Sequence, residues 1–118
     1  MIGLLDKYQN EGTVTKANVK ASGGRVVGLR VTNANIATRY VSIHNKATAP
    51  VATDVPDMYF LLPAGTATVP SVTEINSTMF SEAGRNCPLG IGWSIGTTAN
   101  VFTDGGTAAD HTITITYS

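Results

Sequence analysis

The chain is poor in cysteine and in charge. Cys87 is the single cysteine among 118 residues, which excludes an intramolecular disulfide and a zinc site built on several cysteines. Charged residues make up 14% of the chain, below the roughly 25% that is usual for soluble domains. Hydroxyl groups and backbone must therefore cover much of the surface, and 17 threonines and 12 glycines supply them.

The N-terminal segment lacks the features of a targeting signal. Its apolar stretch runs only from Ile2 to Leu5, an acid follows at Asp6, and no basic region precedes it. This pattern fits neither a signal peptide nor a membrane span. We therefore expect synthesis in a cytoplasm and no membrane partner.

Basic and acidic residues are unevenly distributed, although the formal net charge is zero. Residues 1–46 contain seven Lys or Arg and two acids, whereas residues 47–118 contain one Arg and six acids. Two explanations stay open: the segments neutralise each other as neighbouring strands, or subunits meet head to tail. The basic residues are scattered and are not interleaved with aromatics, so we expect no nucleic acid partner.

Alternation of apolar and polar residues is the strongest pattern in the chain, and it predicts half-buried strands. The clearest examples lie in residues 25–33, 39–45 and 111–118. In the segment of residues 25–33, the outer face is expected to carry Val26, Gly28, Arg30 and Thr32. The apolar faces of the three segments are Val27, Leu29 and Val31, then Val41 and Ile43, and finally Ile113, Ile115 and Tyr117. Further strands are expected at residues 13–19, 57–63, 66–72, 88–96 and 99–103.

Turn-forming residues separate these segments at regular intervals. Only residues 74–84 have a composition typical of a short helix. We therefore predict an all-β fold, a small antiparallel β-sandwich of seven to eight strands, with a jelly roll as one arrangement. Residues 13–118 would form the single domain, preceded by an N-terminal arm over residues 1–12.

The sharpest chemical motif is GWSIG at residues 92–96, which matches the G-x-S-x-G nucleophile elbow. Asp104 or Asp110 and then His111 follow in the chain order of α/β-hydrolases. An elbow needs a helix after its serine, but the residues after Ser94 are β-branched and glycine-rich. We therefore expect a strand with alternating glycines, no catalytic residue and no enzyme activity.

The remaining candidate sites have simpler structural explanations. His44 and His111 lack a third ligand at zinc-site spacing, so each is expected on the outer face of a strand. Asp54 and Asp57 lack the alternating oxygen ligands of a calcium loop. The glycines near residue 92 precede no helix that would receive a phosphate. We expect no metal and no cofactor.

Two segments are expected to contact a partner. Pro50 and Pro56 stiffen the connection over residues 46–56, because proline fixes φ and disfavours helix in the residue before it. The N-terminal apolar residues are too few to form a sheet and too apolar to stay in water. The candidate interface residues are Ile2, Leu4, Leu5, Tyr8, Lys46, Pro50, Asp54 and Pro56.

Parts of the chain resemble small structural proteins of tailed bacteriophage virions. The shared outline is a strand ending in Asn, a loop with Ala-Pro and a later Pro, a strand closing on LPAG, a Gly-Ile stretch with an aromatic, Ala-Asp turns, and a last strand ending in Tyr. These features lie at residues 39–65, 90–98, 108–110 and 112–117. Ala52-Thr53 stands where such proteins often have Gly-Thr, and residues 1–38 and 74–88 do not align.

The resemblance implies a capsid cement or decoration protein that binds the major capsid protein from outside and stabilises the head. It also implies a homo-oligomer, with a trimer as one option, on the capsid exterior of a virion assembled in the host cytoplasm. A tail or head fibre module that binds host glycan stays open, and its exposed aromatics would cluster at one loop end. A hydrolase is the third alternative.

Overall fold

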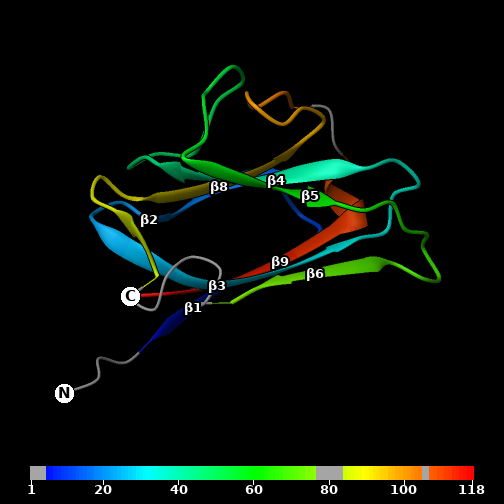
Figure 1. The fold of residues 1–118 in the computed structure, drawn as a ribbon, viewed down its shortest axis with the longest axis horizontal. Helices are drawn as coiled ribbons and strands as arrows, with labels where there is room; N and C mark the ends of the chain where they lie inside the picture. Colours follow the sequence, from blue (N-terminus) through cyan, green and yellow to red (C-terminus); the bar gives the residue numbers. More distant parts are fainter. Residues whose placement is uncertain (1–4, 77–83, 105–106) are drawn as a thin grey trace.

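The computed structural model of the chain describes residues 5–76, 84–104 and 107–118 (Figure 1). The described residues form an all-β fold, as predicted, with nine strands instead of seven to eight. A short 3-10 helix, η1 (Ala108–Asp110), precedes the last strand. The strands are β1 (Asp6–Glu11), β2 (Lys16–Lys20), β3 (Gly24–Asn33), β4 (Arg39–Asn45), β5 (Met58–Leu62), β6 (Ser71–Ile75), β7 (Arg85–Cys87), β8 (Ile91–Gly96) and β9 (His111–Tyr117).

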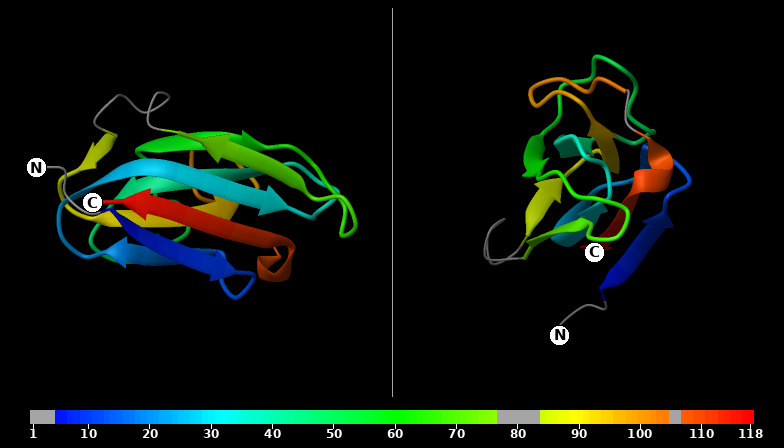
Figure 2. Two further views of the ribbon diagram at one scale, coloured as in Figure 1. Left: turned by 90° about the horizontal axis from the view of Figure 1, so that it is seen from below. Right: turned by 90° about the vertical axis from the view of Figure 1, so that its right-hand side faces the viewer.

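The strands form two antiparallel sheets that face each other (Figures 1 and 2). Sheet A has the order β1-β9-β3-β6, with β7 also paired to β3, and sheet B has the order β2-β8-β4-β5. The pairs β4–β5, β3–β6, β2–β8 and β1–β9 are nested in the sequence. This is the pairing of one long hairpin rolled into two sheets, which is a jelly roll.

The core lies between the two sheets and is built from the apolar face of each strand. Trp93 at the centre of β8 is its largest member and is fully buried. Alternation correctly predicted the inward residues of β4 and β9, because both strands are regular there. The buried apolar cluster comprises Val26, Leu29, Val31, Val41, Ile43, Leu62, Ile75, Cys87, Ile91, Trp93, Ile95, Ile113 and Ile115.

The predicted faces of β3 are wrong in its first half. Val26 is buried in the core, whereas Val27 lies on the outer side and lines a surface trough. The cause is an irregularity between Val26 and Gly28 in the pairing with β9. An extra residue on one strand shifts the alternation of side chains by one position.

The predicted N-terminal arm is in part a strand. β1 pairs with β9 along its whole length, from Asp6 opposite Tyr117 to Glu11 opposite Thr112. Tyr8 is half-buried, and its ring centroid lies 6.1 Å from that of Trp93. The backbone hydrogen bonds and this one half-buried ring place the segment in the sheet without a long apolar run.

Two further segments differ from the predicted elements. Residues 99–103 lie in a loop and in no strand. β6 begins at Ser71 instead of residue 66, because Thr66 donates to the Val69 carbonyl in a turn and Pro70 has no N–H for the ladder. β6 also includes Glu74 and Ile75 from the predicted helical stretch, and residues 77–83 of that stretch lie outside the described residues.

The uneven charge of the two chain segments is neutralised within the fold. Three of the four ion pairs among the described residues join a base from residues 1–46 to an acid from residues 47–118. All are at least partly exposed, so each contributes at most about 1 kcal/mol. The pairs are Lys16–Asp104, Arg30–Glu74 and Lys46–Asp54, with Arg85–Asp57 as the fourth.

Candidate functional site

The outer face of sheet B is covered by two loops of the chain itself. All six residues of β8 are buried, including those that point away from the core. Residues 46–57 and 97–104 lie above β4 and β8, and appear as the green and orange loops at the top of Figure 1. We call these two segments the loop layer.

Small residues on the outer face of β8 make room for the loop layer. A Cβ added to Gly92 would lie 3.2 Å from the Pro50 ring, and one added to Gly96 would lie 2.6 Å from the Thr103 carbonyl oxygen. Ser94 occupies the position between the two glycines. The GWSIG motif is thus explained by close approach of loops to a strand, which confirms the predicted strand with alternating glycines.

Gly96→Val is expected to lower the free energy of unfolding by about 2 kcal/mol, because the new side chain overlaps a backbone carbonyl. Gly28→Val is the matched control, since Gly28 also lies in a strand and the nearest atom to its added Cβ, the Ile75 carbonyl oxygen, would be 3.6 Å away. Urea unfolding of both variants measures the difference. Equal effects would show that the loop layer does not pack tightly on β8.

A buried polar pair lies beneath the loop layer. His44 Nε2 and Ser94 Oγ are 2.8 Å apart, and the two residues are 2% and 1% exposed. The Phe102 ring stands edge-on to the imidazole, with centroids 6.3 Å apart. Burial lowers the pKa of His44 from 6.5 to about 4, so the imidazole is neutral at pH 7.

The residues that follow the chain order of α/β-hydrolases in the sequence are not brought together in the structure. Ser94 contacts His44, whereas His111 Nδ1 donates to the Thr107 carbonyl at 2.9 Å. Asp104 is instead paired with Lys16, and Asp110 accepts from the Asn35 amide at 2.8 Å.

The two histidines differ in the face that they occupy. His44 lies on the outer face of β4, as predicted, although the loop layer covers it. The same prediction is wrong for His111, which is buried on the inward face of β9 with Ile113 and Ile115. The bond to the Thr107 carbonyl satisfies one ring nitrogen there, and burial lowers the pKa of His111.

The charged candidate residues of the loop hold its shape. The Asp54 carboxylate accepts hydrogen bonds from Lys46 Nζ at 2.6 Å and from the Val51 N–H at 2.9 Å. The bond from Lys46 is the main reason why the pKa of Asp54 is lowered. Pro50 is buried and Pro56 is half-buried. These four side chains therefore mainly stabilise the shape of the loop.

Backbone hydrogen bonds join the two loops of the layer. The Thr53 N–H donates to the Phe102 carbonyl, and the Phe102 N–H donates to the Asp54 carbonyl, both at 2.8 Å. The Asp54 N–H closes a turn onto the Val51 carbonyl at 3.1 Å, with Thr53 at φ 75°. The two loops of the layer are therefore hydrogen-bonded to each other.

The tip of the 46–57 loop presents two valines that sequence reasoning missed. Val51 is exposed, and Val55 is 77% exposed. Nearby on the outer face of β5, Tyr59 and Leu61 are also exposed, and Tyr59 packs edge-on against Tyr40. We call Val51, Val55, Tyr59 and Leu61 the outer apolar patch. A valine between Asp54 and a proline, outside any alternating run, was the available signal for an exposed apolar residue.

The N-terminal candidate residues have separate positions. Leu5 is exposed ahead of β1, and Tyr8 packs against Trp93 within its own chain. Ile2 and Leu4 lie outside the described residues. Leu5 and Tyr8 lie ahead of and on β1 in sheet A, whereas the 46–57 loop covers sheet B, so these two residues do not form one surface with the loop.

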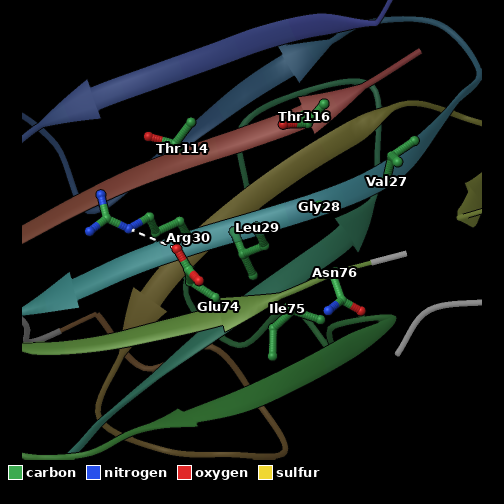
Figure 3. A pocket seen from close by; sticks show the side chains of 9 residues that line it. All are labelled: Val27, Gly28, Leu29, Arg30, Glu74, Ile75, Asn76, Thr114 and Thr116. Carbon is green, nitrogen blue, oxygen red and sulfur yellow. Dashed lines mark ion pairs between the residues drawn. The ribbon is translucent and has the colours of Figure 1, made fainter. Parts of the chain in front are cut away.

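The outer face of sheet A carries a shallow trough of about 360 Å³ between β3, β6 and β9 (Figure 3). Arg30 Nε and Glu74 Oε1 form an ion pair of 3.1 Å at its side. Thr114 and Thr116 present hydroxyl groups from β9, and Gly28 leaves the floor open. The trough therefore combines an apolar floor with a few polar groups.

Comparison of the chain with protein-family models, curated proteins and solved structures gives no match. Among the described residues, no three or more His, Cys, Asp or Glu side chains are placed to hold a metal ion. In the same part of the chain, no helix is long and apolar enough to cross a membrane.

Proposed function

We propose that the chain is a phage capsid cement protein that docks on the head shell through the outer apolar patch. One observation carries the proposal: two exposed large apolar side chains lie on the 46–57 loop and two on β5, and this loop and β5 lie on the same side of the sandwich (Figure 1). Exposed apolar groups that gather on one side of a soluble domain mark protein contacts. Tyrosine is also among the residues enriched at such contacts.

The rigidity of the loop supports the same function. The Lys46–Asp54 ion pair, the turn from Val51 to Asp54 and the bonds to Phe102 hold the valines before any partner arrives. A contact surface that is already ordered loses less conformational entropy on docking. Modest contacts then suffice when they are repeated over a lattice or within an oligomer.

The size of the molecule is compatible with a specific contact. Its extents are 43 × 28 × 22 Å, and a standard interface uses about 800 Å² of each partner. The broad side of the sandwich is large enough for that area. The outer face of sheet A, which is rich in Thr and mixed in charge, would then face solvent or a neighbouring copy.

The test is to purify phage particles that lack the protein, add it back and image them by cryo-electron microscopy. We expect ordered density in regular copies over the shell, with the outer apolar patch towards the major capsid protein, and a raised rupture temperature. Density confined to the tail or to one vertex would overturn the proposal. Binding without a gain in stability would overturn the cementing role and leave decoration.

A second candidate is a fibre module that binds host glycan, and the trough on sheet A favours it. A carboxylate, a guanidinium and hydroxyl groups around an apolar floor suit the hydroxyls and ring of a neutral sugar. The pair of exposed Tyr59 and half-buried Tyr40 lies on a strand face and not at a loop end. NMR titration with neutral monosaccharides should shift the amides of Gly28 and Thr114 if this candidate is right, and Glu74→Gln should remove the shift.

We also propose that Ser94 has no catalytic role. A fluorophosphonate is expected to leave the native protein unlabelled, because Ser94 is 1% exposed beneath the loop layer. Intact-mass spectrometry measures the labelling, with a serine hydrolase as the positive control. Stoichiometric labelling that Ser94→Ala and His44→Gln both abolish would contradict this prediction.

A further inference from the structure

We propose that the loop layer is an acid-released clasp, in which protonation of His44 opens residues 46–57 and 97–104 while the two sheets stay folded. The His44 imidazole is the one titratable group beneath the layer in the described residues. It lies between Ser94 on β8 and the Phe102 ring, where water reaches little of it. A charged imidazolium at this position would lack hydration. Protonation of His44 therefore favours a state in which water reaches the ring.

The charged groups around His44 do not offer the imidazolium a free partner. Asp54 is the acid that faces it, and the carboxylate of Asp54 is already bonded to Lys46 Nζ and to the Val51 N–H. Lys46 carries a like charge and opposes protonation of His44. From the other loop, Phe102 brings an apolar ring, with Lys16 Nζ 5.6 Å from its centroid. Lys16 is itself paired with Asp104 at 3.3 Å.

Opening the layer costs less than unfolding the sandwich. The bonds that must break are the two backbone bonds between the loops at Phe102 and the bonds of Asp104 to Thr15 and Lys16, together with packing on Gly92 and Gly96. The ladders of β4 and β8 and the core beneath them stay in place. Local opening of this kind has its own free energy, below that of global unfolding. Because the layer carries Val51 and Val55, acid would also withdraw part of the outer apolar patch.

The sign of the effect follows from the lowered pKa. His44 binds a proton at about pH 4 in the closed layer, against about 6.5 when it is exposed to water. The closed layer is therefore fully stabilised above pH 6.5 and loses stability as the pH falls towards 4. Between pH 7 and pH 4.5 the opening equilibrium should rise roughly fiftyfold. Asp54, whose pKa is also lowered, acts below this window.

Hydrogen exchange at pH 7 and pH 4.5, corrected for the intrinsic pH dependence of exchange, tests the clasp. We expect the amides of Thr53 and Phe102 to lose protection at pH 4.5 and to stay well below the protection of the β3 and β9 amides, which exchange only when the whole sandwich unfolds. His44→Gln, which keeps a polar group near Ser94 and cannot titrate, should abolish the response. His111→Gln is the control, because His111 lies outside the layer, and it should leave the response unchanged.

Two results would overturn the inference. One is an exchange free energy at pH 4.5 that is the same for the loop layer as for β3 and β9, which would show that the layer opens only by global unfolding. The other is an unchanged pH response in His44→Gln, provided that near-UV circular dichroism at pH 7 shows native packing of this variant. Neither readout depends on particle binding, so failure of the clasp is distinguishable from failure of the proposed function.

Discussion

The double variant Val55→Asp/Leu61→Asp is expected to lose binding to phage heads by about 100-fold or more, because central apolar contacts often contribute 2 kcal/mol or more each. Both substitutions place a carboxylate where the proposed interface excludes water. Val55 is 77% exposed and Leu61 is also exposed, so the fold should be little changed. Sedimentation of labelled protein with heads that lack it measures the binding, and urea unfolding checks the fold.

The matched control is Val69→Asp/Val72→Asp. These valines are also exposed, with Val69 at 72%, and they lie outside the outer apolar patch, in the loop before β6 and on β6. The control should bind like the unmodified protein. Equal loss in both double variants would indicate a general effect of added charge and would contradict docking through the patch.

Asn33→Asp is expected to lower the free energy of unfolding by about 3 kcal/mol or more, since a buried charge would keep a single donor and face two carbonyls. Asn33 is fully buried, and its Nδ2 donates to the Ala37 carbonyl at 3.1 Å and to the Pro63 carbonyl at 3.0 Å. The Asn35 N–H donates to its Oδ1 at 3.0 Å. This one side chain therefore joins the loop after β3 to the loop after β5.

Urea unfolding at pH 7 measures the loss, and Asn86→Asp on β7 is the control, because Asn86 is exposed. The control should change the free energy of unfolding by less than about 0.5 kcal/mol. The loss in Asn33→Asp should shrink as the pH is lowered, because a protonated carboxyl can donate one hydrogen bond. A loss that is the same in both variants would show that the buried amide does not hold the two loops.

The alternation of apolar and polar residues correctly predicted the core-facing side of each strand that is regular. Val41 and Ile43 on β4, and Ile113 and Ile115 on β9, face the core as their alternation predicts. Val26 does not follow its pattern, because the irregularity beside Gly28 shifts the alternation. Sequence alone contains no marker for such a shift other than the glycine itself.

Segments with little apolar character were harder to predict. β1 has only one ring to bury, and its place depends on the edge that β9 offers, which is more than 100 residues away in the sequence. Phe102 was expected in a strand, since β-branched and aromatic neighbours favour one. It is instead buried in a loop, because Gly96 leaves a space on β8 that its ring fills.

The candidate contact surface was likewise predictable in part from the sequence and in part only from the tertiary structure. Pro50 and Pro56 indicated a stiff loop from the sequence, and hydrogen bonds within residues 46–57 give it a defined shape. Which side chains the loop presents depends on the turn at Thr53 and on the ion pair of Asp54. Val51 and Val55 are therefore exposed for reasons that appear only after the loop has folded onto β8.

The sequence by itself determined the all-β class, the single sandwich, the buried faces of the regular strands and the close approach of other chain segments to the glycines of β8. These properties depend on residues near one another along the chain, where period and residue type are sufficient. Only the tertiary structure decided the jelly-roll pairing, the burial of His44 beside Ser94 and the position of the outer apolar patch. Each of these depends on contacts between residues that are distant in sequence, whose energies no local pattern contains.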